Sequence, residues 1–272
     1  MKTAVQLHTL RKACAKDLEE TFRFCAEIGL DGVELSPTGY SKGSFWGKNA
    51  TEVRELADKY GLEICSALVD FPELKENLNE VIQFQREVGN TRVVVPYISL
   101  KTPEMVRDAA KELQPIVDRM KEEGIEVYWH NHGRELKLCK GRLLIDMLLE
   151  QVKGLKLEMD TFWAYAGGQE PKAFLASHAK YMNRLLHVKD GFSLEEMTEE
   201  QAVIANGAQE GLMKTPMIPC VIGKGELPIE ELIHQARELG IEWCILENDL
   251  PFPNGFEDVA ASVKPMTLFA KC

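Results

Sequence analysis

The sequence predicts a single (β/α)8 barrel domain that spans residues 1–272. Short apolar segments typical of strands alternate about eight times with amphipathic helical segments, and this is the number of units at which a parallel sheet closes into a barrel. The chain length is also close to the roughly 250 residues that one such barrel uses. An open doubly wound sheet is the rival architecture. It is disfavoured because no GxGxxG motif follows the first predicted strand.

The predicted elements follow one another in a regular order along the chain. Short apolar runs, often rich in β-branched residues, predict eight strands. They are expected at residues 5–9, 32–35, 63–69, 92–95, 125–132, 155–160, 185–189 and 243–247. Helices are expected at residues 17–28, 51–60, 73–88, 103–123, 142–152 and 228–239, with two more beginning at Pro171 and near Glu257. A glycine follows most of these helices, as Gly61 and Gly89 do, and Pro171 suits the first turn of a helix.

Two predicted connections are longer than a barrel requires. Residues 36–48 carry Phe45 and Trp46 among several glycines, and residues 191–221 contain a helix-like stretch at 194–204. Both connections follow a strand, so both are expected on the face where barrel enzymes place their active sites. They are interpreted either as lids, with Trp46 helping to exclude water from a bound substrate, or as surface decoration and oligomer contacts.

Composition limits the partners that the protein can have. The formal net charge of −11 disfavours binding to nucleic acid or to an anionic membrane surface. No segment has the apolar length needed to cross a bilayer, and the N-terminus lacks the apolar core of a signal peptide. Seven cysteines, odd in number and never in a CxxC pair, fit reduced thiols. We therefore expect a cytoplasmic protein that acts on a small molecule, with a homo-oligomer left open.

Ionisable residues gather at the ends of the last four predicted strands. Each strand end carries two such residues that alternate with another residue and so share a face: His130 with His132, Glu158 with Asp160, His187 with Lys189, and Glu247 with Asp249. Burying a charged group without a partner costs several kcal/mol, so this many unpaired charges would destabilise the fold. A divalent cation resolves this cost because it binds carboxylates and neutral imidazoles in one site. The sequence therefore predicts a metal site where these strands end. Each residue taken singly also fits a salt-bridged group at the rim.

An ordered series of motifs resembles one known family. The motifs are Val5-Gln6-Leu7-His8-Thr9-Leu10-Arg11, Gly29-Leu30-Asp31-Gly32-Val33-Glu34-Leu35, His130-Asn131-His132 followed by Glu135, Met159-Asp160-Thr161-Phe162-Trp163, His187-Val188-Lys189-Asp190, Gly223-Lys224-Gly225-Glu226-Leu227 and the strand of Glu247. Together they resemble the sugar phosphate isomerases/epimerases of the xylose isomerase-like TIM barrel superfamily. The resemblance covers nearly the whole chain, and it is specific for the superfamily rather than for a substrate.

The resemblance implies one divalent metal ion, which we expect to be Mn, Zn, Mg or Co. Its implied ligands come from four strands or their loops, and in this sequence they are Glu135, Asp160, His187 and Glu247. Many relatives carry the first glutamate at the end of strand five, where this chain has His130 in its His-Asn-His run. Glu135 is therefore taken from the HNHxxE pattern, with His132 as the substitute ligand and otherwise a candidate for substrate binding. His130 and Glu158 are expected to contact ligands or substrate, or to be hydrogen-bonded residues of a barrel layer.

The implied reaction is proton transfer next to the carbonyl group of a keto sugar or related polyol. In relatives two metal-bound glutamates move the proton, which here implies Glu247 and Glu135 as catalytic residues. Returning the proton to the same carbon gives epimerisation, and returning it to the neighbouring carbon gives aldose–ketose isomerisation. Lys189 is expected to hydrogen-bond a substrate oxygen or to form a plain ion pair with Asp190 or Glu158. Glu34 is a further candidate for the pocket, and Trp46 is the candidate from the loop.

Two other functions stay open at this point. A metal-dependent dehydratase of a keto-inositol-like polyol would use the same enediolate to expel a β-hydroxyl group. A carbohydrate-binding barrel without turnover is the non-catalytic alternative, supported by the absence of a glutamate at the strand-five position. An endonuclease is disfavoured because the chain is acidic and has only six histidines, and no motif indicates NAD or pyridoxal phosphate.

Overall fold

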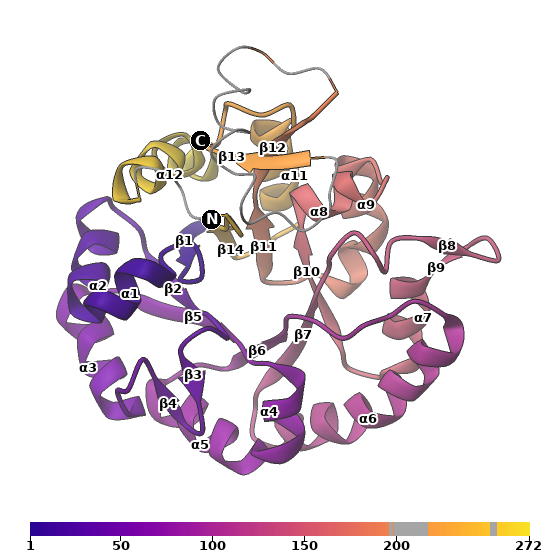
Figure 1. Ribbon diagram of the computed structural model, residues 1–272, viewed down its shortest axis with the longest axis horizontal. Coiled ribbons are helices and arrows are strands. Elements are labelled where there is room, and N and C mark those ends of the chain that lie inside the picture. Colours follow the sequence, from indigo (N-terminus) through magenta and orange to yellow (C-terminus); the bar gives the residue numbers. More distant parts are fainter. Residues whose placement is uncertain (196–197, 199–216, 251–254) are drawn as a thin grey trace.

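The computed structural model describes residues 1–195, 198, 217–250 and 255–272. Within these residues eight parallel strands close into a barrel in the order β1-β14-β11-β10-β7-β6-β5-β2, ringed by helices (Figure 1). The barrel strands are β1 (Lys2–Gln6), β2 (Gly32–Leu35), β5 (Glu63–Leu68), β6 (Arg92–Val95), β7 (Glu126–His130), β10 (Lys156–Asp160), β11 (Leu185–Val188) and β14 (Trp243–Leu246). The predicted (β/α)8 barrel is confirmed.

The helices follow the strands and pack around the outside of the barrel. They are α1 (Arg11–Lys16), α2 (Leu18–Glu27), α3 (Ala50–Tyr60), α4 (Phe71–Glu76), α5 (Leu78–Val88), α6 (Pro103–Glu122), α7 (Leu144–Gln151), α8 (Thr161–Ala166), α9 (Pro171–His178), the short 3₁₀ turn η1 (Ala179–Tyr181), α11 (Ile229–Glu238) and α12 (Phe256–Lys271). Each longer helix turns an apolar face to the sheet. In the part of the chain that the structure describes, no helix has the length and apolar character to span a membrane.

Two of the three clusters of buried apolar residues in the described part of the chain stabilise the barrel itself. The larger one lies between the strands and the surrounding helices. The smaller one forms a separate cluster of buried side chains from the barrel strands, consisting of Ala4, Cys65, Leu68, Val94, Tyr128, Leu185, Trp243 and Ile245. The barrel strands are therefore buried on both faces, which explains why their sequences are nearly continuous apolar runs rather than alternating patterns.

The first strand differs from its prediction. It was expected at residues 5–9, but β1 begins at Lys2 because its residues pair with β14, from Lys2 opposite Trp243 to Val5 opposite Leu246. It ends at Gln6 because the chain then turns, with the Thr9 amide bonded to the Gln6 carbonyl at 3.0 Å. Pairing with the last strand closes the barrel, and a partner so distant in sequence leaves no local signal.

Helix boundaries follow local capping chemistry. Asn49 and Glu52 form a reciprocal capping box at the start of α3, and Gly61 ends that helix in the left-handed conformation at φ 67°. The helix expected over residues 73–88 is divided into α4 and α5. Asn77 lies between them at φ −130° and ψ 37°, outside the helical region, and its side chain donates to the Glu73 carboxylate. The break arises because this short side chain competes for local hydrogen bonds.

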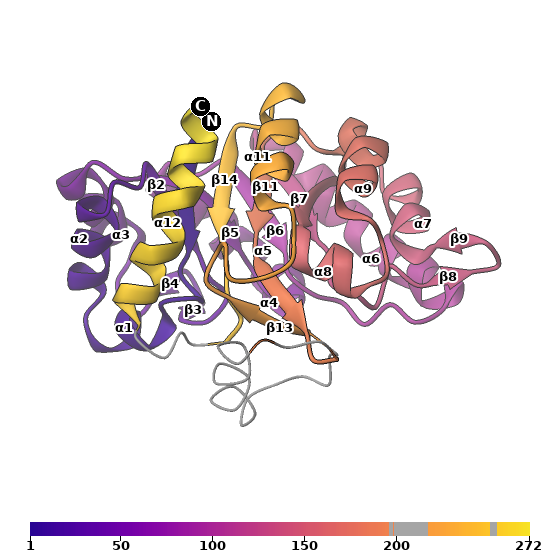
Figure 2. The same ribbon diagram turned by 90° about the horizontal axis from the view of Figure 1, so that it is seen from above.

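Additional antiparallel pairs extend from the carboxyl ends of the barrel strands. They are β3 (Tyr40–Ser41) with β4 (Ser44–Phe45), β8 (Leu138–Cys139) with β9 (Arg142–Leu143), and β12 (Asp190–Ser193) with β13 (Met217–Cys220). Figure 2 shows β3, β4 and β13 at the end of the barrel toward which β11 and β14 point. Phe45 is fully buried in the larger core. Of the helix-like stretch expected at residues 194–204, residues 194, 195 and 198 are described and are not helical, and the rest lies outside the described residues.

Candidate metal-binding and active site

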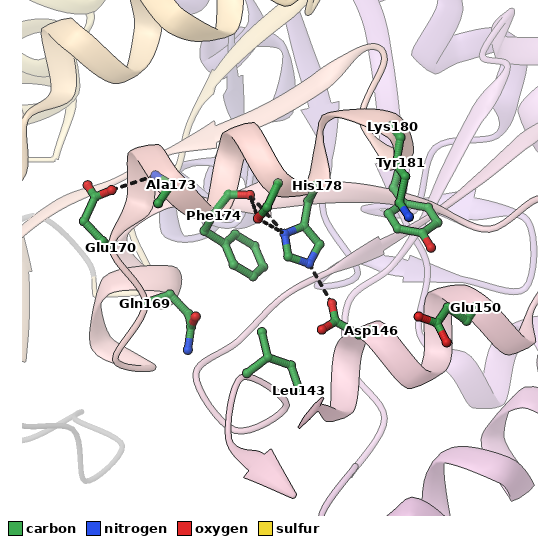
Figure 3. Close-up of a pocket in the computed structure, with 11 residues that line it drawn as sticks. Leu143, Asp146, Glu150, Gln169, Glu170, Ala173, Phe174, His178, Lys180 and Tyr181 are labelled. Carbon is green, nitrogen blue, oxygen red and sulfur yellow. Dashed lines mark hydrogen bonds and ion pairs between the residues drawn. The ribbon is translucent and has the colours of Figure 1, made fainter. Parts of the chain in front are cut away.

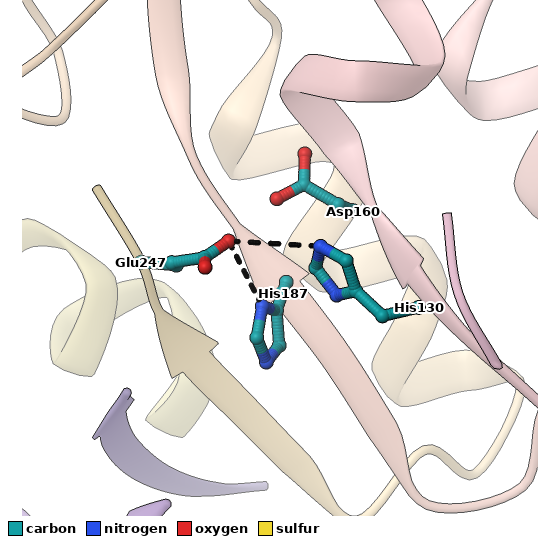
Figure 4. A group of neighbouring side chains, drawn as sticks. All are labelled: His130, Asp160, His187 and Glu247. Atoms are coloured by element: carbon teal, nitrogen blue, oxygen red, sulfur yellow. Dashed lines mark hydrogen bonds and ion pairs between the residues drawn. The ribbon is translucent and has the colours of Figure 1, made fainter. Parts of the chain in front are cut away.

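Four neighbouring strands bring four ligand-type side chains together at the carboxyl end of the barrel. His130 and Asp160 end β7 and β10, His187 lies in β11, and Glu247 directly follows β14. One ligand atom from each residue lies within 4.8 Å of the others, and all four residues are buried (Figure 4). Asp160 pairs with His187 across the β10–β11 ladder, whereas His130 pairs with Glu158 in β10. The four side chains therefore come from adjacent strands near their carboxyl ends, at different register positions.

Carboxylates beneath this group hold both imidazole rings. His187 Nε2 lies 2.7 Å from Glu34 Oε2 and 3.2 Å from Glu158 Oε2, while His187 Nδ1 lies 3.2 Å from Glu247 Oε2. His130 Nδ1 lies 3.1 Å from the same Glu158 oxygen. A carboxylate behind a metal-ligating histidine fixes the ring orientation and the tautomer. Glu34 and Glu158 are fully buried, so their contacts are with the imidazoles rather than with the mouth of the barrel.

Asp160 is held in place by the backbone around it. Its Oδ1 accepts from the Trp163 amide at 2.7 Å as the N-cap of α8, and its own amide donates to Asn131 Oδ1 at 2.9 Å. The other oxygen, Oδ2, is buried and forms an ion pair with Lys189 Nζ at 3.1 Å. Asp160 therefore presents one fixed oxygen toward the grouped side chains.

Lys189 is a fully buried cation beside this group. Its Nζ lies 3.1 Å from Asp160 Oδ2, 2.7 Å from Glu247 Oε2 and 2.7 Å from Asp249 Oδ2. The Thr161 hydroxyl bonds both the amide and the carbonyl of Lys189, each at 3.0 Å, so the backbone at this position is clamped. Lys189 does form ion pairs, but the predicted partners Asp190 and Glu158 were wrong, because its partners are Asp160, Glu247 and Asp249.

The charges of this cluster set which carboxyls are ionised. Burial raises the pKa of Glu247, but Lys189 and His187 outweigh burial and hold that pKa well below its usual range. Glu158 behaves similarly, because His187 and His130 outweigh burial and lower its pKa to about 2. Both carboxylates therefore stay ionised at neutral pH, and Glu247 is available as a base or as a ligand.

Glu34 and Asp160 respond in the opposite direction. Burial, together with the Glu158 charge, raises the pKa of Glu34 to about 8. Burial raises the pKa of Asp160 to about 6, against the attraction of Lys189. The pKa of His187 is well above its usual value because Glu158 and Glu34 outweigh burial. A metal ion that binds here must therefore displace a proton from His187.

Glu135 and His132 lie near this group but are held differently. Glu135 Oε1 accepts from Trp129 Nε1 at 3.1 Å and from the His132 amide at 2.7 Å, and burial raises the pKa of this carboxyl. Glu135 is not among the grouped ligand atoms, and His130 takes the fourth place instead. His132 is half-buried against Trp163, and its Nδ1 is buried with no hydrogen-bond partner in the described part of the chain.

Trp46 belongs to a different part of the barrel end. It follows β4, stands edge-on to Phe45 and packs over Gly39, where an added Cβ would lie 2.4 Å from the indole. Its place in a substrate pocket stays a prediction.

Two structural features of the site were not predicted. Asp249 was noted only for sharing a face with Glu247, yet it is the third partner of Lys189. Asp190 accepts from four backbone amides, those of Gly191, Gly223, Gly225 and Leu227, and so fixes the loop that carries the Gly-Lys-Gly-Glu-Leu motif. An alanine at 225 would place its Cβ 2.0 Å from Asp190 Oδ1. The closely spaced Gly223 and Gly225 were the sequence signal that a side chain packs tightly against this backbone.

A separate cavity of about 480 Å³ lies between α7 and α9 on the outside of the barrel (Figure 3). His178 is its central polar group. This ring stacks on Phe174 at 4.0 Å, with Nε2 2.8 Å from Asp146 Oδ1 and Nδ1 2.9 Å from Ser177 Oγ. Both ring nitrogens therefore have protein partners, and this cavity lacks the convergent ligand atoms of the barrel end.

A model of the xylose isomerase-like TIM barrel family matches residues 22–264. The chain belongs to this family. Solved structures of similar fold include a sugar phosphate isomerase/epimerase from Parabacteroides distasonis, with a TM-score of 0.75, 20% identity and coverage of 97% of both chains. No curated protein sequence matches the chain.

Two further solved structures show the same likeness at lower identity. The probable 3-DHS dehydratase AsbF from Bacillus anthracis superposes with a TM-score of 0.73 at 16% identity, covering 98% of this chain and 99% of that one. A xylose isomerase-like TIM barrel protein from Mycobacterium smegmatis, in complex with magnesium, gives a TM-score of 0.69 at 14% identity, with 99% and 97% covered. At these identities the likeness shows the fold.

The donor set of this xylose isomerase-like barrel fits a divalent metal ion. Two imidazoles and two carboxylates converge, both imidazoles have a carboxylate behind them, and the buried Asp160 Oδ2 already pairs with a cation, the ammonium of Lys189. Mixed nitrogen and oxygen ligands suit zinc, manganese and cobalt, and a set made only of oxygens would suit magnesium better.

Proposed function

We propose that the protein is a divalent-metal-dependent isomerase or epimerase that acts on a keto sugar or related polyol. One observation carries the proposal: His130, Asp160, His187 and Glu247 converge at the carboxyl end of the barrel, with carboxylates behind both imidazoles. Enzymes of this fold place their chemistry at that end. Relatives of the same fold include proteins named as sugar phosphate isomerases/epimerases, and this supports the substrate class.

In this proposal His130, Asp160, His187 and Glu247 hold the metal, with His130 in the place that the family resemblance implied for Glu135. A bound divalent cation would supply Lewis-acid polarisation of the substrate carbonyl. Among the candidates Mn, Zn, Co and Mg, the two imidazole donors favour the first three.

Proton transfer is assigned to two carboxyl groups. Glu247 is held ionised by Lys189 and His187, so it can accept the proton from the carbon next to the carbonyl. Glu135 has a pKa raised by burial, which suits a group that carries a proton and returns it. Return to the same carbon from the other face gives epimerisation, and return to the neighbouring carbon gives isomerisation. The reaction consumes no second reactant.

Substrate contact is assigned first to His132. Its ring is half-buried, its Nδ1 has an unused hydrogen-bonding position, and burial lowers its pKa well below the usual value, so the ring is neutral and can accept or donate. Trp163 packs against this ring and offers an apolar wall. Glu34, Glu158 and Lys189, which were expected to meet substrate, are placed in the proposal as supports of the ligand set.

The experiment uses purified protein dialysed against a chelator and a panel of keto sugars and polyols in D2O. Mn2+ is expected to restore turnover, with one deuterium incorporated next to the carbonyl and otherwise no change in mass. Glu247→Gln is expected to abolish turnover. Full activity in protein shown to be metal-free, or product without deuterium exchange, would overturn the proposal.

A dehydratase is the second candidate, because one structural relative is named as a probable dehydratase and the same proton abstraction precedes loss of a β-hydroxyl group. Product mass separates the two reactions, since dehydration removes water. A barrel that binds carbohydrate without turnover would retain ligand affinity in the absence of any product. The seven cysteines are odd in number and never form a CxxC pair, and this supports a cytoplasmic location for each of these functions.

A further inference from the structure

Lys189 joins two sets of carboxylates that differ in their relation to the metal ligands. Asp160 and Glu247 belong to the grouped ligand atoms, and both contact Lys189 Nζ. Asp249 also contacts Nζ, at 2.7 Å, but it is not among those atoms, and 31% of its side chain is exposed at the rim. The ammonium therefore stands between the ligand set and an acid outside it.

The surroundings of Lys189 restrict how it can respond to a second cation. Thr161 clamps its backbone on both sides, and the rings of Phe162 and Trp163 lie 5.8 Å and 5.3 Å from Nζ. Only the side chain is left to adjust its position. Arg11 Nη2 donates to the backbone carbonyl of Asp249 at 2.8 Å. This hydrogen bond holds Asp249, the partner of Lys189 that is not a grouped ligand, in place.

A divalent cation held by Asp160 and Glu247 shares both carboxylates with the ammonium of Lys189. Like charges repel, and the repulsion is strong where burial excludes water. The same ammonium is needed in the absence of another cation, because buried carboxylates without a counter-charge destabilise the fold. Asp249 gives Lys189 a charged partner that the metal does not use.

We infer that Lys189 is a built-in counter-cation that competes with the metal for Asp160 and Glu247, and that Asp249 raises the metal affinity by giving Lys189 a charged partner to keep when the metal takes those two carboxylates. This inference rests on the proposed function. Lys189 and Asp249 are positioning residues in this inference, because they change how strongly Asp160 and Glu247 bind the metal without being ligands themselves.

The test measures Mn2+ binding by isothermal titration calorimetry and thermal unfolding of chelator-treated protein. Lys189→Met is expected to bind Mn2+ at least about tenfold more tightly and to unfold at a lower temperature without metal, since the buried acids lose their counter-charge. Asp249→Asn is expected to bind Mn2+ about threefold or more weakly, because Lys189 then stays on the ligand carboxylates. Lys156→Met removes an ion-paired lysine at the opposite end of the barrel and serves as the matched control, with unchanged affinity.

A double variant separates this inference from a simple through-space charge effect. In the Lys189→Met background, Asp249→Asn is expected to change the Mn2+ affinity by less than about twofold, since its partner is gone. Additive effects, or weaker binding in Lys189→Met, would refute the role of Lys189. If Lys189→Met does not fold, unchanged or tighter binding in Asp249→Asn refutes it alone. A wild-type protein that binds none of Mn2+, Zn2+, Co2+ and Mg2+ overturns the proposed function as well. If the wild type binds metal but the Mn2+ affinities of the variants do not follow the expected order, only this inference is overturned.

Discussion

Replacement of Glu34 by glutamine tests the electrostatics beneath the metal site. The Glu34 carboxyl is fully buried, lies 2.7 Å from His187 Nε2 and accepts from the Ser66 hydroxyl. Burial and the Glu158 charge raise its pKa to about 8, so the folded protein at pH 7 carries this group mainly in its protonated form. Glutamine has nearly the same shape and no charge, so it resembles that form at every pH.

The magnitude follows from proton linkage. A glutamate in the unfolded chain ionises near its reference pKa of 4.5, while folding keeps Glu34 protonated up to about pH 8. Below pH 4.5 both states are protonated and the group has no effect. Between these values the wild type loses about 1.4 kcal/mol of stability per pH unit, which reaches about 3 kcal/mol at pH 7. Glu34→Gln is therefore expected to raise the free energy of unfolding by about 2–3 kcal/mol at pH 7 and by less than about 1 kcal/mol at pH 5.

The assay is urea unfolding of chelator-dialysed protein at pH 5, 6, 7 and 8. Glu158→Gln is the matched control, because attraction by His187 and His130 outweighs burial and lowers the pKa of Glu158 to about 2. Its ionised form is favoured by folding, so this variant is expected to be destabilised by a similar amount at all four pH values. A Glu34→Gln stability difference that is negative, or that does not grow with pH, would refute the reasoning.

Other substitutions test the ligand set and its support. His130→Ala is expected to weaken Mn2+ binding by more than about a hundredfold, whereas Glu135→Gln keeps it within about threefold, because the amide oxygen still accepts from Trp129 and His132; calorimetry showing the reverse order would restore Glu135 as the ligand. Asp190→Asn is expected to lower the free energy of unfolding by about 2–4 kcal/mol in urea titrations, because the new amide group faces two backbone donors of the loop that it holds. A loss below about 0.5 kcal/mol would show that this carboxylate does not hold the loop.

Much of the fold was predictable because its signals are local. The valine run of β6 and the capping box at the start of α3 each lie within a few residues of sequence. The two clear misplacements have non-local or competing causes. β1 takes its start from pairing with β14, and the helix expected over residues 73–88 is interrupted at Asn77 by side-chain hydrogen bonds.

The candidate site was predictable in part for the same reason. Asp160, His187 and Glu247 stand at strand ends, where alternation along the strand and the parallel order of the barrel place them together. The fourth position was decided between two residues of one short segment. Glu135 is only five residues beyond His130, and its carboxylate is taken by Trp129 and the His132 amide.

The sequence by itself determined the barrel, the end of it that carries the polar residues and most of the residue types that meet there. Strand periodicity and helix capping depend on residues that are close together along the chain, so both can be recognised in the sequence alone. The tertiary structure decided which oxygen or nitrogen each residue presents. Glu34 lies 153 positions from His187, and Lys189 lies 60 positions from Asp249, yet these pairs are in contact. Such contacts depend on strand register and on competition among buried charges for partners, and neither is encoded by spacing in the sequence.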